Sequence, residues 1–165
     1  MGNHVTQHPM TPSSLTLQWL RQNVQPYLNK DSVYIHIDAA LSRFPTLRPK
    51  SDIYSPVFFS FSQPFNHLIT SSVFDDGRSQ LLLCLHGLLP ISFRGASYNI
   101  PIAIWLTRQY PRYPPITYVI PTSDMLVKPG KYIDVSGRCN IEYIQNWERK
   151  SEASICFQYF SAPVP

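Results

Sequence analysis

The chain has 165 residues, which suffices for one compact domain and is too short for two of ordinary size. Hydrophobic residues make up 44% and aromatic residues 13% of the sequence, so the apolar surface available for burial excludes a largely disordered protein. The formal net charge of +4 comes from scattered Lys and Arg residues and forms no dense basic stripe, so we expect no nucleic-acid partner.

The proline and cysteine contents indicate what kind of backbone the protein has and which cellular compartment suits it. The 16 prolines are about twice what an average content of roughly 5% predicts, which indicates many extended segments and rigid turns. Three cysteines without a C-x-x-C pair favour a reducing compartment. Residues 1–12 contain no apolar signal core, and the uncharged stretch 53–74 is too rich in Ser, Asn, Gln and Pro to span a bilayer. We therefore expect a cytoplasmic protein without a transmembrane segment.

Two helices are predicted in the first third of the chain. Ser13 or Ser14 can cap a helix whose apolar residues recur at helical spacing as far as Leu28, although Pro26 disfavours its last turn. The second helix is predicted over residues 32–44, where the apolar positions again form one stripe.

Strands follow the helices. The predicted strands are Lys50–Tyr54, Gln80–Leu88, Tyr98–Leu106 and Ile116–Ile120. Asp75-Asp76-Gly77 is a hairpin signal between the first two strands. Helices followed by four strands in meander order predict an α+β domain with an antiparallel sheet. The rest of the chain is predicted to be mostly loop until residues 142–147.

The residues that could carry chemistry form no catalytic or metal-binding pattern. The sequence has no Gly-rich phosphate loop and no Gly-x-Ser-x-Gly elbow. Cys139 follows a Gly-Arg pair, where a cation could activate a thiolate, but a half-buried hydrophobe is the favoured interpretation. Cys84 and His86 share one strand face, and two ligands alone make a poor zinc site, so a core cysteine is favoured. We expect no metal and no cofactor.

Aromatic residues gather near prolines in the second half of the chain. They are Phe93, Tyr98, Trp105, Tyr110, Tyr113 and Tyr118. Aromatic grooves bind proline-rich peptides, because such ligands are already extended and lose little entropy on docking. Composition alone favours the alternative that these rings form the core of the sheet, and both interpretations stay open at this point.

Several short motifs occur in a fixed order. They are Phe44-Pro45-x-Leu47-Arg48-Pro49, Val73-Phe74-Asp75-Asp76-Gly77, Tyr98-Asn99-Ile100-Pro101, Tyr110-Pro111-x-Tyr113-Pro114-Pro115, Pro121-Thr122-Ser123-x-Met125 and Asp134-x-x-Gly137. Over residues 13–54 and 72–147 this order resembles the ubiquitin-conjugating-enzyme variant (UEV) domain of the tumour-susceptibility/vacuolar-sorting subunit of ESCRT-I. The resemblance implies a ubiquitin-conjugating-enzyme-like α+β fold: an N-terminal helix, a four-stranded antiparallel meander sheet, and a truncated or atypical C-terminal helix.

The resemblance also implies a division of the chain. Residues 1–12 are a flexible lead, residues 13–153 the UEV domain, and residues 154–165 an irregular tail. Residues 56–70 lie between two strands that in this family are joined by a short turn. We therefore interpret them as an inserted segment, whose composition, rich in Phe and without charge, resembles translated non-coding sequence.

Two binding sites are implied by the resemblance. Pro-Ser/Thr-x-Pro peptides would bind Ile91, Phe93, Tyr98, Asn99, Thr122 and Met125. Ubiquitin would bind Val73, Asp75, Asp76, Trp105 and Tyr118. Phe93 stands where the family usually has Tyr, and Asp75 where it more often has Asn, so one hydroxyl and one amide donor are missing.

The same comparison argues against catalysis. In conjugating enzymes the acceptor cysteine lies three residues beyond the Gly of the Asp-x-x-Gly turn, and here that position is Asn140, which cannot form a thioester. The implied function is a non-catalytic adaptor that sorts ubiquitinated cargo to multivesicular bodies, peripheral on the endosome membrane. Its implied partners are ubiquitin, peptides of upstream sorting adaptors, and other ESCRT-I subunits. The alternatives are a ubiquitin-conjugating enzyme or a cofactor in ubiquitin-chain formation, and an unrelated proline-rich-peptide-binding module.

Overall fold

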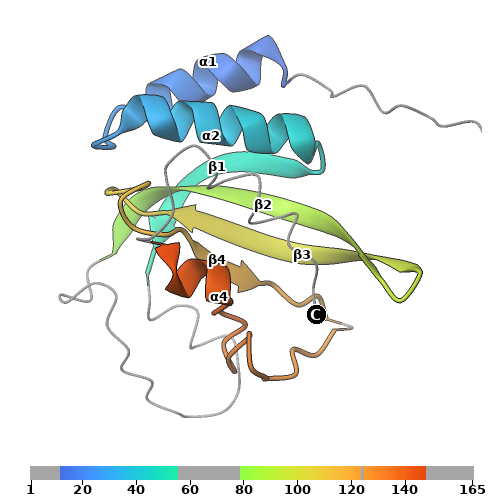
Figure 1. The fold of residues 1–165 in the computed structure, drawn as a ribbon. Coiled ribbons are helices and arrows are strands. Elements are labelled where there is room, and N and C mark those ends of the chain that lie inside the picture. Colours follow the sequence, from blue (N-terminus) through green and yellow to red (C-terminus); the bar gives the residue numbers. More distant parts are fainter. Residues whose placement is uncertain (1–11, 56–78, 124, 148–165) are drawn as a thin grey trace, which may run out of the picture.

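The computed structural model describes residues 12–55, 79–123 and 125–147, in which two helices cover one face of a four-stranded sheet (Figure 1). Helix α1 spans Ser14–Asn23 and helix α2 spans Lys30–Arg43. A short helix, α4 (Glu142–Gln145), follows later in the chain, and the flanking residues Ile141 and Trp147 pack with the core that the two N-terminal helices cover. None of the helices in the described ranges is long and apolar enough to cross a membrane.

The bounds of the two N-terminal helices differ from those predicted. Ser13 is the N-cap of α1, and its hydroxyl accepts a hydrogen bond from the Thr16 amide at 3.2 Å. This helix ends at Asn23 rather than near Leu28, because Pro26 cannot continue the ladder and the chain turns there instead. Helix α2 begins two residues earlier than predicted and buries one stripe of apolar side chains, Val33, Ile37, Ala40 and Leu41.

The four strands follow in chain order in the sheet, and each neighbouring pair is antiparallel. They are β1 (Leu47–Tyr54), β2 (Gln80–Phe93), β3 (Ala96–Leu106) and β4 (Ile116–Val119). The order β1-β2-β3-β4 confirms the predicted antiparallel meander.

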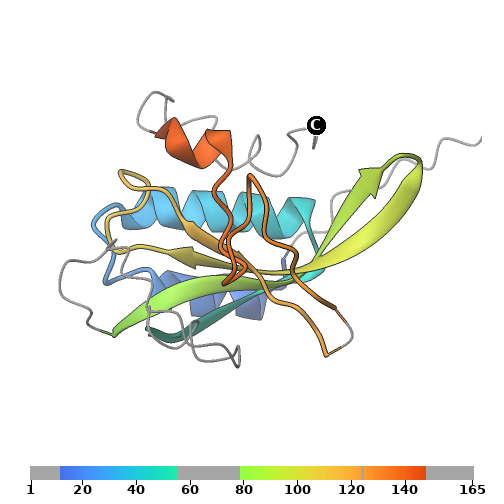
Figure 2. The same cartoon turned by 90° about the horizontal axis from the view of Figure 1, so that it is seen from below.

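Strands β1, β2 and β3 are longer than the sequence predicted. Strand β1 begins at Leu47 rather than Lys50, and β2 and β3 continue beyond β1 and β4 as a two-stranded hairpin (Figures 1 and 2). Arg94 and Gly95 close this hairpin with positive φ angles of 50° and 79°. The hairpin contains Pro90 and Pro101, which sequence reasoning treats as strand breakers.

The direction of the backbone groups explains why these prolines are tolerated. The Leu83 amide donates to the Tyr27 hydroxyl, which donates in turn to the Leu106 carbonyl, so odd-numbered residues of β2 point their backbone groups toward β3. Pro90 therefore faces the side of β1, beyond the end of that strand. Pro101 faces the side of β4, where its carbonyl accepts from the Ile120 amide at 2.9 Å. Neither proline removes a ladder donor.

Alternating side chains give the sheet two different cores. On the helix-covered face, Leu47, Leu83, Leu85, Ile102 and Ile104 pack against the two helices. On the opposite face, which we call the outer face (Figure 2), a second buried cluster contains Tyr54, Leu82, Cys84, Ala103, Trp105, Ile116 and Tyr118. The outer face is where a partner can approach strands that no helix covers.

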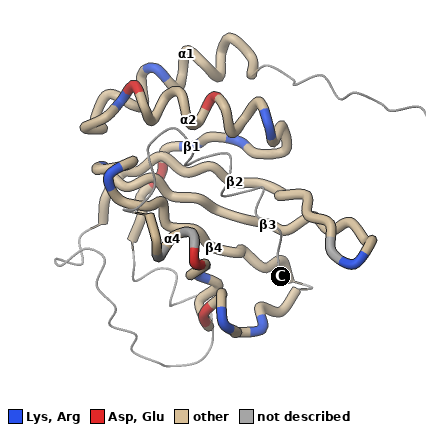
Figure 3. Tube along the Cα trace, viewed as in Figure 1, with Lys and Arg blue, Asp and Glu red and all other residues tan. Residues whose placement is uncertain are grey.

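Two polar contacts fasten the segment after β3 to other elements. The Tyr110 hydroxyl lies 2.9 Å from His36 Nδ1 on α2. Trp147 donates its indole N–H to the Pro111 carbonyl at 2.7 Å, and its ring packs beside that of Tyr110. Charged residues of the described part are spread over helices, hairpin turn and loops rather than gathered in one stripe (Figure 3).

Candidate binding surfaces on the hairpin and the outer face

The predicted peptide-binding residues fall into two groups, and the first lies on the β2–β3 hairpin. Ile91 is the cross-strand partner of Tyr98, and Asn99 is the partner of Pro90. Tyr98 is 47% exposed, which is high for an aromatic ring on a strand. Phe93 is the last residue of β2, and its side chain is outside the described part. The hairpin projects past the helices, so its exposed side chains are accessible (Figure 1).

The second group follows β4. Thr122 and Met125 are held in one turn, because the Met125 amide donates to the Thr122 carbonyl at 3.0 Å. Met125 is 37% exposed. The hydrogen bond from the Ile120 amide to the Pro101 carbonyl ties this segment to β3, three residues beyond Tyr98. An exposed ring and an exposed thioether on two linked segments suit contact with an extended apolar ligand.

The predicted ubiquitin-binding residues are described only in part. Trp105 and Tyr118 lie side by side on the outer face, and both are only 4% exposed. Tyr54 contacts both: its ring centroid is 5.3 Å from that of Trp105, and its hydroxyl is 3.1 Å from the Tyr118 hydroxyl. These rings thus offer a partner little surface and serve chiefly as core.

Other sequence predictions lie outside the described residues. These are the remaining ubiquitin-binding residues Val73, Asp75 and Asp76, the hairpin signal at 75–77, the interpreted insertion 56–70, the lead 1–11 and the tail 154–165.

The Asp134-x-x-Gly137 motif is a tight turn beside β4. One Asp134 carboxylate oxygen accepts from the amides of Ser136 at 2.8 Å and Arg138 at 3.0 Å. Gly137 has a φ of +82°, and a Cβ there would lie 2.5 Å from the Val119 carbonyl oxygen. Only glycine fits, because a side chain would meet both backbone strain and a clash.

The two residues after this turn have different environments. Cys139 is half-buried, and burial raises the pKa of its thiol to about 11, so it is protonated at neutral pH. Asn140 is exposed, and its amide donates to the Tyr132 carbonyl at 2.8 Å. Its amide side chain cannot act as a nucleophile toward a thioester.

Cys84 lies within the outer cluster and is fully buried, and burial raises its pKa to about 12. Its neighbour on the same strand face, His86, is only partly buried. In the described ranges no three His, Cys, Asp or Glu side chains are grouped so that they could hold a metal ion.

Sequence reasoning missed a pocket of about 400 Å³ on the outer face. Its lining includes Lys50, His86, Leu88, Ala103, Trp105 and Ile120. Lys50, Cys84 and Trp105 form one cross-strand row, and Arg48, His86, Ala103 and Tyr118 form the next. The signal was present in the strand alternation, but it needed the register between strands that are distant in sequence.

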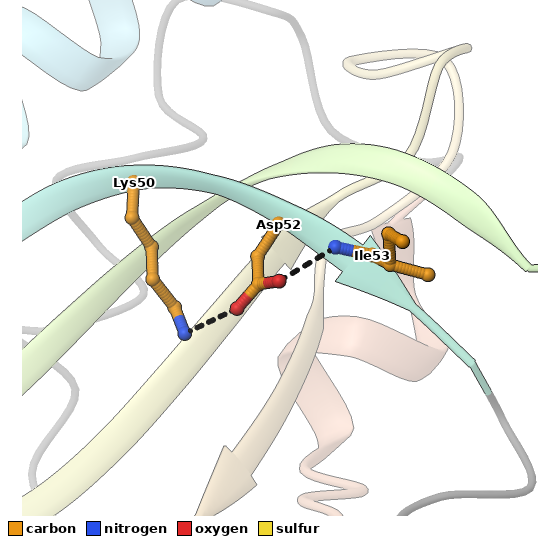
Figure 4. A network of polar contacts seen from close by, with 3 residues as sticks. All are labelled: Lys50, Asp52 and Ile53. Carbon is orange, nitrogen blue, oxygen red and sulfur yellow. Dashed lines mark hydrogen bonds and ion pairs between the residues drawn. The ribbon is translucent and has the colours of Figure 1, made fainter.

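Charges at this pocket are mainly positive. Lys50 lies above the Trp105 ring, 5.7 Å from its centroid, and its ammonium is 2.8 Å from Asp52 (Figure 4). Desolvation, followed by the charges of Lys50 and Arg48, lowers the pKa of His86 below its ordinary value. His86 is therefore neutral at pH 7 and can donate one N–H.

Comparison with known proteins identifies relatives for most of this chain. The family model described as the UEV domain matches residues 19–158. Protein ELC of Arabidopsis thaliana is 38% identical over 120 residues, which are 72% of this chain and 26% of that protein. Tumor susceptibility gene 101 protein of Homo sapiens is 44% identical over 81 residues, which are 49% of this chain and 21% of that protein. The chain thus spans about a quarter or less of the length of these curated relatives.

Two solved structures share the fold. One is the yeast Vps23 UEV domain in complex with a Vps27 PSDP peptide; it is 22% identical, with a TM-score of 0.63 over 84% of this chain and 82% of that chain. The other is a complex of the Vps23 UEV with ubiquitin; it is also 22% identical, with a TM-score of 0.67 over 92% of this chain and 91% of that chain.

Proposed function

Because this chain belongs to the UEV domain family, we propose that it is a non-catalytic adaptor domain that binds ubiquitin and Pro-Ser/Thr-x-Pro peptides. In this role it acts within ESCRT-I, at the endosome membrane, in sorting ubiquitinated cargo to multivesicular bodies. The observation that carries the proposal is the family match over residues 19–158, and the two Vps23 complexes of the same fold support it. The decisive experiment is a chemical-shift titration of the chain with ubiquitin and, separately, with a Pro-Thr-Ala-Pro peptide.

The peptide site is proposed at Ile91, Phe93, Tyr98, Asn99, Thr122 and Met125. The exposure of Tyr98 and Met125 supports it, since these side chains are accessible and apolar. Asn99 supplies a donor and an acceptor for the peptide backbone.

Replacing these residues tests the peptide site. Tyr98→Ala should weaken peptide binding more than Met125→Ala, which we expect to reduce affinity by about 1–2 kcal/mol. Tyr113→Ala, which removes another exposed tyrosine outside the proposed site, is the matched control and should leave affinity unchanged. Unaltered peptide affinity in a folded Tyr98→Ala protein would contradict the assignment.

The ubiquitin site is proposed at Val73, Asp75, Asp76, Trp105 and Tyr118. The carboxylates of Asp75 and Asp76 complement the basic patch that ubiquitin presents. A small patch of this kind gives weak binding, about −5 to −6 kcal/mol, which corresponds to a high-micromolar dissociation constant.

Asp76→Ala tests this site with the least risk to folding, whereas Trp105→Ala would remove a buried ring from the outer cluster. The double variant Asp76→Ala with Trp105→Phe should abolish ubiquitin binding and leave peptide binding intact. Asp31→Ala on α2 is the control for loss of one exposed carboxylate. Loss of both ligands together from a folded variant would contradict two separate sites.

We propose further that Asn140 occupies the position of the acceptor cysteine of conjugating enzymes, so the domain transfers no ubiquitin. The raised pKa of Cys139 supports this, because its thiol is protonated and half-buried. Cys139→Val should bind both ligands as the parent protein does. A reductant-sensitive ubiquitin adduct on Cys139, formed with activating enzyme and ATP, would overturn the proposal.

The segment 56–70 is proposed to be an insertion within the UEV domain, which occupies residues 13–153. The described strands β1 and β2 on either side of it pair with each other over eight positions, which supports a direct connection between them. Sequencing the mature transcript tests this proposal. A mature message that encodes the segment would refute its origin in non-coding sequence.

A further inference from the structure

We propose that the pocket on the outer face binds an apolar group that carries a carboxylate, with the apolar part in the pocket and the carboxylate on Lys50. The proposal rests on described residues alone; the pocket shares Trp105 with the ubiquitin site proposed above and shares no residue with the proposed peptide site. It follows from three features: Lys50 already binds a carboxylate, that of Asp52; the neighbouring side chains are mainly basic; and the cavity is apolar and of limited size.

The carboxylate position is visible in the structure. Lys50 and Asp52 are two residues apart on β1, so both side chains lie on the outer face, and their charged atoms are 2.8 Å apart (Figure 4). The two side chains are 41% and 51% exposed. An ion pair so exposed contributes little, because water and salt screen it and two side chains must be ordered. The carboxylate of a ligand can therefore bind the Lys50 ammonium, either together with Asp52 or in its place.

The surround of the pocket is positive and selects against a basic ligand. Arg48 and His86 are cross-strand partners beside Lys50, and the only carboxylate that the structure shows bonded to Lys50 is Asp52. Desolvation is the main cause of the lowered pKa of His86, and the charges of Lys50 and Arg48 lower it further, as neighbouring positive charges do. The neutral imidazole can donate its N–H to an anion.

The rest of the lining is apolar. Trp105 and Ala103 lie on β3, and Leu88 and Ile120, which are 44% and 37% exposed, lie farther along the same face. A cavity of about 400 Å³ is near the lower end of the roughly 300–1,000 Å³ of ligand pockets. It accommodates one bicyclic ring or one large side chain. It is too small and too apolar for a nucleotide.

Two sources supply this chemistry: a small organic acid, or a peptide that ends in a large apolar residue with a free carboxylate. The probes are 2-naphthoate with 2-naphthamide as its neutral match, and acetyl-Ala-Phe as the free acid with its C-terminal amide as match. Shifts of the backbone amides of Lys50, His86 and Ala103 and of the Trp105 indole are followed by NMR. With about 13 heavy atoms, naphthoate should bind with a dissociation constant on the order of 1 mM.

Three variants sharpen the test. Lys50→Gln should weaken naphthoate about fivefold, which is the upper range for an exposed ion pair. Asp52→Asn should strengthen it, because Lys50 loses its internal competitor while the Asn oxygen still accepts from the Ile53 amide, as Asp52 does at 2.8 Å. Lys131→Gln, which removes a lysine held over Tyr132 outside the pocket, is the matched control and should change nothing.

The outcomes separate cleanly. Binding of the free acids above their amides supports the proposal, and the probe that binds more tightly identifies the source. Equal binding of acid and amide would overturn the role of Lys50. No binding, or shifts confined to other surfaces, would overturn the site. Neither probe contains a proline motif, so failure here leaves the adaptor function standing, and failure of the adaptor function leaves this pocket standing.

Discussion

The helix-covered face and the outer face of this sheet are filled by different side chains. The core on the helix-covered face is mainly aliphatic: Ile37 and Leu41 of α2 meet Leu83, Leu85 and other aliphatic residues of the sheet, and Tyr27, Tyr110 and Trp147 complete the cluster. No helix in the described ranges covers the outer face, which is filled by rings, aliphatic side chains and a thiol, with Tyr54, Trp105 and Tyr118 in one cluster. Large rings can cover one another where no second layer exists, because each buries more area than an aliphatic side chain.

Polar atoms are buried on both faces. On the outer face the hydroxyls of Tyr54 and Tyr118 bond to each other. On the opposite face, Thr117 is the partner of Ile104, and its buried hydroxyl has no hydrogen-bond partner in the described part of the chain. Both faces thus combine close packing with buried hydrogen bonds, which the Tyr27 hydroxyl makes on the helix-covered side, and the outer face in addition has a ligand-sized pocket.

The largest expected effect is loss of packing under the helices. Ile37→Ala should lower the free energy of unfolding by about 2–5 kcal/mol, because Ile37 is 1% exposed and the helix cannot fully close the cavity left behind. Urea denaturation measures it. Ile35→Ala is the control. Ile35 lies two residues away on the exposed side of the same helix and is 61% exposed, so its loss should change the free energy of unfolding by less than about 0.5 kcal/mol.

A smaller effect is expected on the outer face. Tyr118→Phe keeps the ring and removes the hydroxyl that contacts Tyr54, so the free energy of unfolding should fall by about 1 kcal/mol. Burial and the Tyr54 hydroxyl raise the pKa of Tyr118, so the parent protein keeps this contact throughout the neutral range. The double variant with Tyr54→Phe should lose little more, since both partners are then absent. Additive losses would show that the hydroxyls act independently.

The smallest effect is pH-dependent and also belongs to the outer face. The pKa of His86 is lowered from about 6.5 by desolvation, Lys50 and Arg48, so the unfolded chain binds this proton more readily than the folded one. The contribution of His86 to stability is therefore full above pH 6.5 and declines as the pH falls below it. Unfolding free energies measured between pH 7.5 and 5 should fall more steeply for the parent than for His86→Gln. Parallel curves would contradict the lowered pKa.

The sequence predicted the sheet well and its hairpin poorly. The apolar run 81–85 and the order of the strands led to the correct meander. Pro90 and Pro101 made the ends of β2 and β3 look like loops, because a proline in a paired strand normally removes a donor. Only the arrangement of neighbouring strands shows that both prolines face positions beyond the ends of β1 and β4.

The candidate sites were predictable to different degrees. Tyr98 and Met125 were found through motif order, and their exposure agrees with a binding role. The burial of Trp105 and Tyr118 agrees with the interpretation, favoured by composition, that these rings form the core of the sheet, but their contacts with Tyr54, a residue distant in sequence, were not predictable. The pocket was missed for the same reason: Lys50 and Trp105 meet only through the register of β1, β2 and β3.

Among the described strands, β1 is an edge strand, which has a consequence for self-assembly. Even-numbered residues of β1 face β2, so the backbone groups of Leu47, Pro49, Ser51 and Ile53 point outward, where another strand could add. Three of these four positions offer no amide: Leu47 donates to the Phe44 carbonyl, Pro49 has no N–H, and Ile53 donates to the Asp52 carboxylate. A second chain that approached in register would find almost no donors. The sequence and local hydrogen bonds of β1 thus disfavour edge-to-edge polymerisation through this strand.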